Sequence, residues 1–147
     1  MFSNIYQNKK VLITGHTGFK GTWLTAWLLE LGASVIGVSK GIPTNPSMFN
    51  ELKLEDKIKN YREDIRDLPK MIDIVSTEKP DFIFHLAAQP IVSTSYSDPV
   101  ETISSNVVGT MNILEALRAS NHKCIGIIIT SDKAYDNVEQ VWGYKED

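Results

Sequence analysis

The sequence predicts an α/β fold in which parallel strands alternate with helices. Short apolar runs recur along the chain, and stretches with helical spacing follow several of them. The run within residues 81–89 is almost unbroken, as expected for a strand that is covered on both faces. The first run ends in three glycines spaced three residues apart, which is typical of a strand, a tight turn and a helix. A chain of 147 residues is long enough for one domain with one core.

The first strand is predicted at residues 11–13, and the glycine motif follows it. Gly15 permits the tight turn, Gly18 permits close approach of a phosphate to the backbone, and Gly21 permits the helix to pack near the strand. Gly32 stands where a left-handed C-terminal cap belongs. The helix between them is predicted from apolar side chains at i, i+4 and i+8 and from their neighbours, namely Trp23, Leu24, Trp27, Leu28 and Leu31.

Two shorter strands and a helix are predicted in the middle of the chain. The second strand covers residues 34–39, and a brief third strand ends near Tyr61. Between them, the prolines and asparagines of residues 41–54 predict a loop with at most one short turn of helix. The helix that follows has Leu68, Met71, Ile72 and Val75 at helical spacing, and Lys79-Pro80 ends it.

A long helix is predicted to begin after Asp98, between the fourth strand and the fifth, which covers residues 124–129. Asp98 is a suitable N-cap, Pro99 suits the first helical position, and Glu101 stands where a capping-box partner belongs. The buried stripe of this helix is expected to be Ile103, Val107, Met111, Leu114 and Leu117. With right-handed crossovers, the whole alternation predicts a Rossmann-type parallel sheet of order 3-2-1-4-5 with helices on both faces.

The composition narrows the class of protein. Hydrophobic residues make up 42% of the chain and charged residues 22%, which is ordinary for a globular protein. The net charge of −3 and the lack of a basic run do not favour a nucleic-acid or membrane partner. No apolar stretch has the ~18 residues of a membrane helix, and residues 1–10 do not resemble a signal peptide. The single Cys124 is expected to be a buried, inert thiol in a cytoplasmic protein, and no metal site is assigned.

Three glycines alone also mark an ordinary turn, but here a strand and a helix flank them, which favours a dinucleotide site.

Two positions at the end of the second strand bear on the choice between NAD and NADP. NAD-binding folds commonly carry an acidic residue near the end of the second strand, where this chain has Ser39 and Lys40. Ser39 can bond a ribose hydroxyl. Lys40 tolerates a 2′-phosphate or is a solvated surface lysine, so these residues leave NAD and NADP open.

Several segments resemble the extended short-chain dehydrogenases/reductases that act on nucleotide sugars. The glycine motif (residues 14–21) and His-Leu-Ala-Ala (residues 85–88) match the wider pattern. The finer resemblance is to the CDP-glucose 4,6-dehydratase family and includes Pro-Thr-Asn-Pro, Thr-Ser-Asp-Lys-Ala-Tyr-Asp-Asn and Trp-Gly-Tyr, at residues 43–46, 130–137 and 142–144. This resemblance implies NAD as cofactor, CDP-glucose as the nucleotide-sugar substrate, and a homo-oligomer at full length.

The resemblance also implies a set of cofactor-binding residues. An Asp-aliphatic pair lies against the adenine in this family, and Asn106 stands where an asparagine braces the active site. Ala87 and Ala88 are small and leave room for a ligand, whereas His85 is expected to be a hydrogen-bonded core histidine. The assigned residues are Gly15, Thr17, Gly18, Phe19, Gly21, Ser39, Lys40, Asp64, Ile65, Leu86, Ala87, Ala88, Gln89, Ser105 and Asn106.

Three consecutive residues after the fifth strand are assigned to catalysis by the resemblance. Ser131 would bond the C4 oxygen of the sugar, and Asp132 would protonate the departing 6-hydroxyl, which requires a raised pKa. Lys133 replaces a glutamate thought to handle the C5 proton, so its amine would need a depressed pKa. Spacing alone also fits a capped turn with a surface ion pair.

One departure from the family pattern limits the expected activity. The family uses a Tyr-x-x-x-Lys pair downstream, but Tyr135 is followed by Glu139 at this spacing, and no substrate-binding half is present. Residues 1–147 are therefore interpreted as the N-terminal NAD-binding part of a longer dehydratase, inactive alone. The alternatives are a nucleotide-sugar epimerase or reductase on the same scaffold, or a non-catalytic dinucleotide-binding protein.

Overall fold

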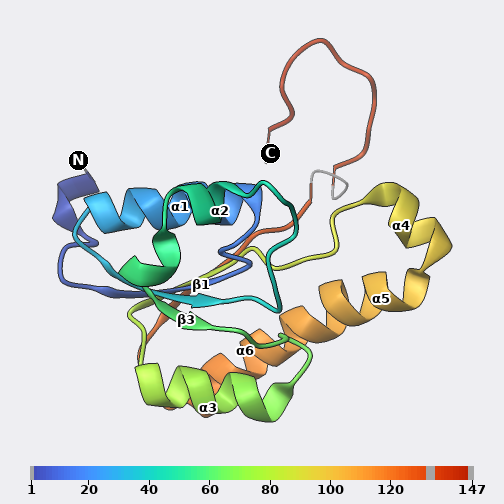
Figure 1. The fold of residues 1–147 in the computed structure, drawn as a ribbon. Helices are drawn as coiled ribbons and strands as arrows, with labels where there is room; N and C mark the ends of the chain where they lie inside the picture. Colours follow the sequence, from blue (N-terminus) through green and yellow to red (C-terminus); the bar gives the residue numbers. More distant parts are fainter. Residues whose placement is uncertain (1, 132–134, 146–147) are drawn as a thin grey trace.

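The computed structural model describes residues 2–131 and 135–145, whose arrangement is drawn in Figure 1. The strands are β1 (Lys10–Thr14), β2 (Ser34–Val38), β3 (Lys59–Tyr61), β4 (Phe82–His85) and β5 (Ile125–Ile128). The α-helices are α1 (Phe19–Glu30), α2 (Met48–Glu51), α3 (Leu68–Glu78), α4 (Val92–Ser97), α5 (Pro99–Ile103) and α6 (Gly109–Ala119). Shorter helical segments are η1 (Phe2–Asn4), η2 (Leu54–Lys57) and η3 (Ser104–Val108), the last with π-helical hydrogen bonding.

The strands of the described residues form one parallel sheet in the order β3-β2-β1-β4-β5, which confirms the predicted Rossmann-type topology. Helices α1 and α2 lie on one face of the sheet, and α3 and α6 lie on the other (Figure 1). Thr14 is in register with both Val38 and His85, so β1, β2 and β4 end together at one edge. In open parallel sheets, ligands bind beyond this carboxyl edge.

The sheet separates two apolar cores, because successive side chains of a strand point to opposite faces. Leu12 belongs to the core that α3 and α6 cover, together with Ile83 of β4. Val11 and Ile13 belong to the core on the other face, where they pack with Leu28 of α1. The cores therefore fix α1 and α6 on opposite sides of β1 and leave its carboxyl end for the glycine turn.

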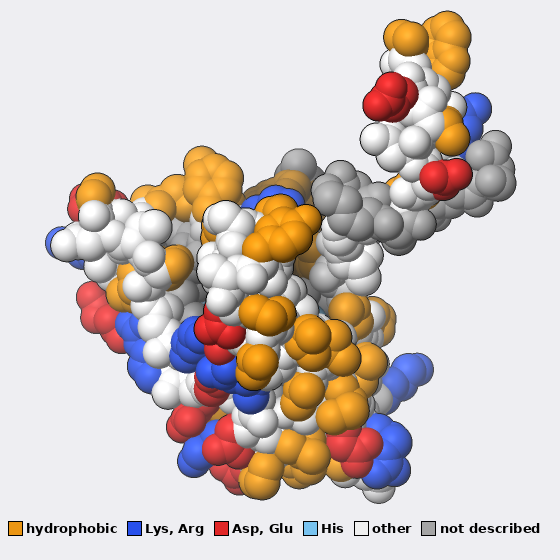
Figure 2. Space-filling model, turned by 90° about the vertical axis from the view of Figure 1, so that its right-hand side faces the viewer, with side chains coloured by type: hydrophobic (Ala, Val, Ile, Leu, Met, Phe, Trp, Pro, Cys, Tyr) orange, Lys and Arg blue, Asp and Glu red, His pale blue; other side chains and the backbone are white. Residues whose placement is uncertain are grey.

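The predicted buried stripe of the long helix is wrong. Of its members, Leu117 packs partly against the core, whereas Ile103 is 59% exposed and Val107, Met111 and Leu114 are also exposed. The residues that face the core are instead Gly109, Asn112, Ile113 and Ala116. A Cβ on Gly109 would stand 2.4 Å from Cδ1 of Ile65, which lies in the loop after β3, so glycine is needed at this position of the inner face. Hydrophobic side chains gather on the side of the molecule where α4 and α5 lie (Figure 2).

Helix α1 lies where the sequence predicts it, but its two tryptophans are largely exposed. Trp23 and Trp27 are 58% and 47% exposed, and the buried side chains are Thr22, Thr25 and Leu28 with Gly21. The first turn of α1 packs closely on Gly15 and His16, so Gly21 has no room for a side chain. Gly32 has φ of +79° and its N–H donates to Leu29 O at 3.0 Å, which confirms the predicted left-handed cap.

The Cys124 thiol is half-buried instead of fully buried. Burial nevertheless raises the pKa of this thiol to about 11, so the expected inertness agrees with its surroundings. Within residues 2–131 and 135–145, no helix combines the length and the apolar character needed to cross a membrane.

Candidate dinucleotide-binding site

The glycine turn is held closely against the exit of β4. Gly15 has φ of +72°, and a Cβ there would stand 2.8 Å from the backbone nitrogen of Ala87. At Gly21, a Cβ would stand 2.1 Å from the carbonyl oxygen of Gly15. At Gly18, by contrast, the nearest atom to such a Cβ is Gly15 O at 3.4 Å, an ordinary contact. Gly15 and Gly21 are thus required by packing, while Gly18 leaves space next to the turn.

The first turn of α1 provides donors for an anion. Gly18 is its N-cap and has no side chain to accept from the helix, and Gly18 O accepts from Thr22 N at 2.8 Å. Among the hydrogen bonds of the described residues, none gives an acceptor to the backbone N–H groups of Phe19, Lys20 or Gly21. Unpaired N–H groups at the start of a helix suit a phosphate, so this turn fits the pyrophosphate of a dinucleotide.

Hydroxyl groups connect the glycine turn to the end of β2. Thr17 Oγ1 donates to Gly41 O at 2.6 Å and lies 2.8 Å from Ser39 Oγ. Ser39 Oγ donates to Gly41 O at 3.0 Å. These bonds place Ser39 next to the turn, at the position where the ribose of a dinucleotide is expected.

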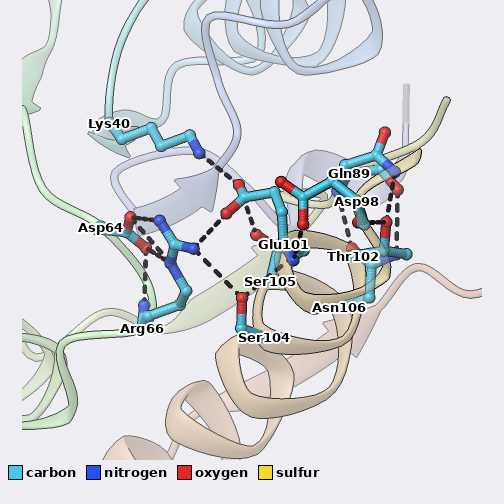
Figure 3. A network of polar contacts seen from close by, with 10 residues as sticks. All are labelled: Lys40, Asp64, Arg66, Gln89, Asp98, Glu101, Thr102, Ser104, Ser105 and Asn106. Carbon is cyan, nitrogen blue, oxygen red and sulfur yellow. Dashed lines mark hydrogen bonds and ion pairs between the residues drawn. The ribbon is translucent and has the colours of Figure 1, made fainter. Parts of the chain in front are cut away.

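The exit of β4 is fixed by a reciprocal pair of hydrogen bonds. Asn106 Oδ1 accepts from Gln89 N at 2.7 Å, and Asn106 Nδ2 donates to Gln89 O at 3.0 Å. Gln89 Nε2 donates to Thr102 Oγ1 at 2.8 Å (Figure 3). Between these bonds and the glycine turn, Ala87 is half-buried and Ala88 is exposed. Asn106 therefore fixes the backbone at Gln89, and its bracing of the active site stays a prediction.

Four charged side chains meet beyond β2 and β3 (Figure 3). Lys40 Nζ lies 2.8 Å from Glu101 Oε1, and Arg66 Nη1 donates to Glu101 Oε2. Arg66 Nη2 lies 2.6 Å from Asp64 Oδ2. The contact with Lys40, and then that with Arg66, holds the pKa of the Glu101 carboxyl below its usual value. Arg66 likewise lowers the pKa of Asp64, so both carboxylates are ionised at neutral pH.

Sequence reasoning did not find the role of Glu101. Asp98 Oδ1 accepts from Glu101 N at 2.9 Å, which confirms the predicted N-cap. The predicted capping-box role of Glu101 is wrong, because its carboxylate contacts Lys40 and Arg66. Ser105, assigned to the cofactor, is buried and donates to Glu101 Oε1 at 3.2 Å. An acidic residue in the first turn of a helix was the available signal, but it does not indicate partners 61 and 35 residues away.

Asn112 is a second residue that sequence reasoning missed. It is buried on α6, and its Nδ2 donates to Ile65 O at 3.0 Å and to Arg66 O at 2.9 Å. These bonds hold the loop that carries Asp64 and Arg66. Ile65 itself is buried under Gly109, so its side chain belongs to the core.

The candidate catalytic segment follows β5 at the same edge of the sheet. Ser131 is exposed there, three residues after the end of β5. Asp132 and Lys133 lie outside the described residues, so their proposed roles stay predictions.

Phe19 and Leu86, both assigned to the cofactor, differ in exposure. Phe19 is exposed at the start of α1, and Leu86 is half-buried after β4.

The site thus consists of a glycine turn, a helix N-terminus and small residues at the carboxyl edge of a parallel sheet. A family model described as GDP-mannose 4,6 dehydratase matches residues 12–147, which include all of these parts. The chain belongs to the GDP-mannose 4,6-dehydratase family.

Relatives in sequence and neighbours in structure match most of this chain. The CDP-glucose 4,6-dehydratase of Salmonella typhimurium is 48% identical over 143 residues, which cover 97% of this chain and 40% of the relative. The structure of the epimerase Mth375 from Methanothermobacter thermautotrophicus has a TM-score of 0.80 at 26% identity and covers 97% of this chain and 41% of that one. The Thermus thermophilus UDP-glucose 4-epimerase, determined in complex with NAD, has a TM-score of 0.67 at 29% identity, covering 76% of this chain and 34% of its own. This chain therefore spans about two fifths of the length of the dehydratase it resembles.

Proposed function

We propose that the chain is the NAD-binding part of a nucleotide-sugar 4,6-dehydratase that converts CDP-glucose to CDP-4-keto-6-deoxyglucose. The observation that supports this most strongly is the glycine turn, whose helix N-terminus carries unpaired N–H groups next to the small residues after β4. The choice of CDP-glucose rests on the 48% identity to the Salmonella enzyme. NAD agrees with the NAD complex of the Thermus epimerase.

The overall reaction removes one molecule of water from the sugar. The nicotinamide of NAD would accept a hydride from C4 and later return it to C6. Between these steps C5 loses a proton, C6 loses its hydroxyl as water, and C5 finally regains a proton. Because one cofactor is oxidised and reduced within a turnover, the protein must hold it throughout. The N–H groups at the start of α1 would hold its pyrophosphate, and Ser39 would bond the ribose.

The residues after β5 would act on the sugar. Ser131 would hydrogen-bond the C4 oxygen and Asp132 would deliver the proton that leaves with the 6-hydroxyl. That role requires a protonated carboxyl and hence a raised pKa for Asp132. Lys133 would move the C5 proton only if burial lowered the pKa of its amine.

We also propose that residues 1–147 are the N-terminal portion of the active protein. The Tyr-x-x-x-Lys pair that would take the C4 hydroxyl proton is not found downstream of Ser131 in this sequence. At full length, we expect a homo-oligomer, because the apolar side chains exposed on α5 and α6 need a cover.

The direct test is to incubate the full-length protein with NAD and CDP-glucose and to identify the product by mass and NMR. A 4-keto-6-deoxy sugar, 18 Da lighter than the substrate, supports the dehydratase. An isomer of unchanged mass would instead establish an epimerase, the second function compatible with this scaffold. No NAD binding by calorimetry would contradict both.

A further inference from the structure

The charges beyond β2 differ from those expected for an NAD site. A carboxylate at the end of the second strand usually bonds the ribose hydroxyls of NAD, whereas a nearby basic residue accommodates the 2′-phosphate of NADP. Here Lys40 lies two residues after the end of β2, and Arg66 lies in the loop after β3. Two cations at this edge would, by themselves, favour NADP.

Glu101 engages both of these cations. Its Oε1 lies 2.8 Å from Lys40 Nζ, and its Oε2 accepts from Arg66 Nη1 (Figure 3). The other side of the Arg66 guanidinium is bound by Asp64, to which Nε donates at 3.0 Å and Nη2 at 2.6 Å. The two cations and two carboxylates of this cluster therefore balance in charge.

The carboxylate of Glu101 is held in place by its surroundings. Asp98 caps the helix on which Glu101 lies, and Ser105 Oγ donates to Glu101 Oε1. The side chain of Glu101 is 27% exposed, compared with 61% for Lys40. Helix α5 runs through η3 into α6, which is fixed to the core by Ile113. The contact with Lys40 therefore joins a carboxylate that its neighbours hold in place to a lysine whose side chain is largely exposed.

We propose that Glu101 is the residue that makes the site select NAD over NADP. It supplies, from α5, the carboxylate that is missing at the end of β2. A 2′-phosphate carries a charge close to −2 at neutral pH and would meet cations that Glu101 and Asp64 already neutralise. The 2′-phosphate would lie close to the negative carboxylates of Glu101 and Asp64, and both cations of the cluster are already paired and cannot offset the repulsion. This repulsion disfavours NADP. This inference rests on the proposed function, because it concerns the same dinucleotide site.

The test is the Glu101→Gln variant of the full-length protein, with the Kd of NAD and of NADP measured by calorimetry. Glutamine keeps the shape and one acceptor but removes the charge, so Lys40 and Arg66 become available to a phosphate. We expect the ratio of the NADP Kd to the NAD Kd to fall by about tenfold, because the repulsion between the Glu101 carboxylate and the 2′-phosphate is lost. Replacing Lys40 by methionine in the Glu101→Gln protein should reverse most of that fall.

The matched control is Glu115→Gln, which removes the same charge from a partly exposed glutamate that pairs with Arg118 on α6 at 2.6 Å. The ratio of the NADP Kd to the NAD Kd in this variant should stay within about twofold of the wild type, because a surface salt bridge acts only on nearby groups. An unchanged ratio in Glu101→Gln with NAD still bound would overturn the inference and leave the proposed function intact. Tighter binding of NADP than NAD by the wild type would also overturn it. A wild type that binds neither cofactor would overturn the proposed function as well.

Discussion

Thr14 and His85, the last residues of β1 and β4, face each other in register and share a hydrogen bond of 2.7 Å between Oγ1 and Nδ1. Ala87 N donates to Thr14 Oγ1 at 3.2 Å, so the Thr14 hydroxyl is free to donate to His85. On the other side, Thr110 Oγ1 donates to Asn106 O at 2.7 Å and therefore accepts from His85 Nε2 at 3.0 Å. These directions assign His85 the neutral tautomer with its proton on Nε2.

This arrangement predicts a pH-dependent stability that His85→Gln should reduce. Burial lowers the pKa of His85 to about 4, so between that pH and about 6.5 the unfolded chain binds a proton that the folded chain does not. Stability from this group is complete above pH 6.5 and falls as the pH decreases. By linkage, His85 accounts for about 2 kcal/mol of the loss between pH 7 and pH 5.

Urea unfolding of both proteins at pH 7, 6 and 5 measures this effect. The loss in free energy of unfolding should be smaller in His85→Gln by that amount. A residual dependence is expected in both, because burial also lowers the pKa of His16. Equal losses in the two proteins would contradict the assignment of His85 as a buried neutral histidine.

Gly18→Val is predicted to remove NAD binding without unfolding the protein. Gly18 has φ of −74° and ψ of 170°, which any residue adopts, and a Cβ there has no close contact. The valine would instead occupy the space in which a pyrophosphate reaches the helix N-terminus, so we expect the NAD Kd to rise at least about tenfold. Circular dichroism should remain helical, with a loss of stability of about 1 kcal/mol from the poorer N-cap.

Two other glycines serve as controls for this prediction. Gly21→Val should unfold or strongly destabilise the chain, because its Cβ would stand 2.1 Å from Gly15 O. Gly143→Val should change neither property, since no atom lies within 4 Å of a Cβ there. Unchanged NAD affinity in Gly18→Val would show that the glycine turn does not hold the pyrophosphate.

The two faces of the long helix predict opposite effects of one substitution. Ile113 on α6 is 1% exposed, whereas Ile103 on α5 is 59% exposed. In residues 1–147, Ile113→Ala should therefore cost about 2–5 kcal/mol of stability through lost packing. Ile103→Ala should cost no more than about 0.5 kcal/mol. Thermal or urea unfolding of the two variants measures these losses in free energy of unfolding. A larger loss in Ile103→Ala would contradict our assignment of the buried face.

Sequence patterns predicted the elements of this fold better than the faces that they bury. Most strands were predicted to within about a residue or two, because short apolar runs between turn residues are local signals. In α6, apolar residues lie on both sides, and the side with Gly109, Ile113 and Ala116 faces the core, where Gly109 leaves room for the side chain of Ile65. A periodicity that treats all apolar residues alike cannot distinguish these two sides of the helix.

In the candidate site, too, some residues could be assigned from the sequence and others could not. Gly15, Gly18 and Gly21 could be assigned from the sequence because a phosphate-binding turn needs glycines at fixed spacing within one short segment, and their binding of a pyrophosphate stays a prediction. The pairing of Lys40 with Glu101 was not found, because it joins the ends of a strand and a helix that the folded chain alone brings together. The role of Asn112 could not be predicted either, because its hydrogen-bond partner is also far away in the sequence.

The last prediction is that residues 1–147 alone have no dehydratase activity, whereas the full-length protein has it. Downstream of Ser131, no Tyr-x-x-x-Lys pair is present to take the C4 hydroxyl proton. Loss of one general base costs about 10²–10⁴-fold in rate. Loss of the residues that position the sugar removes a contribution that can reach about 7–11 kcal/mol.

Together these losses should place turnover below detection, even where the glycine turn still binds NAD. Both proteins would be incubated with NAD and CDP-glucose at equal concentration, and the 4-keto-6-deoxy product would be quantified. Measurable product from residues 1–147 would overturn our interpretation of this chain as a portion of the active enzyme. Absence of product from the full-length protein would instead argue against CDP-glucose as its substrate, because that protein would contain every group that the reaction needs.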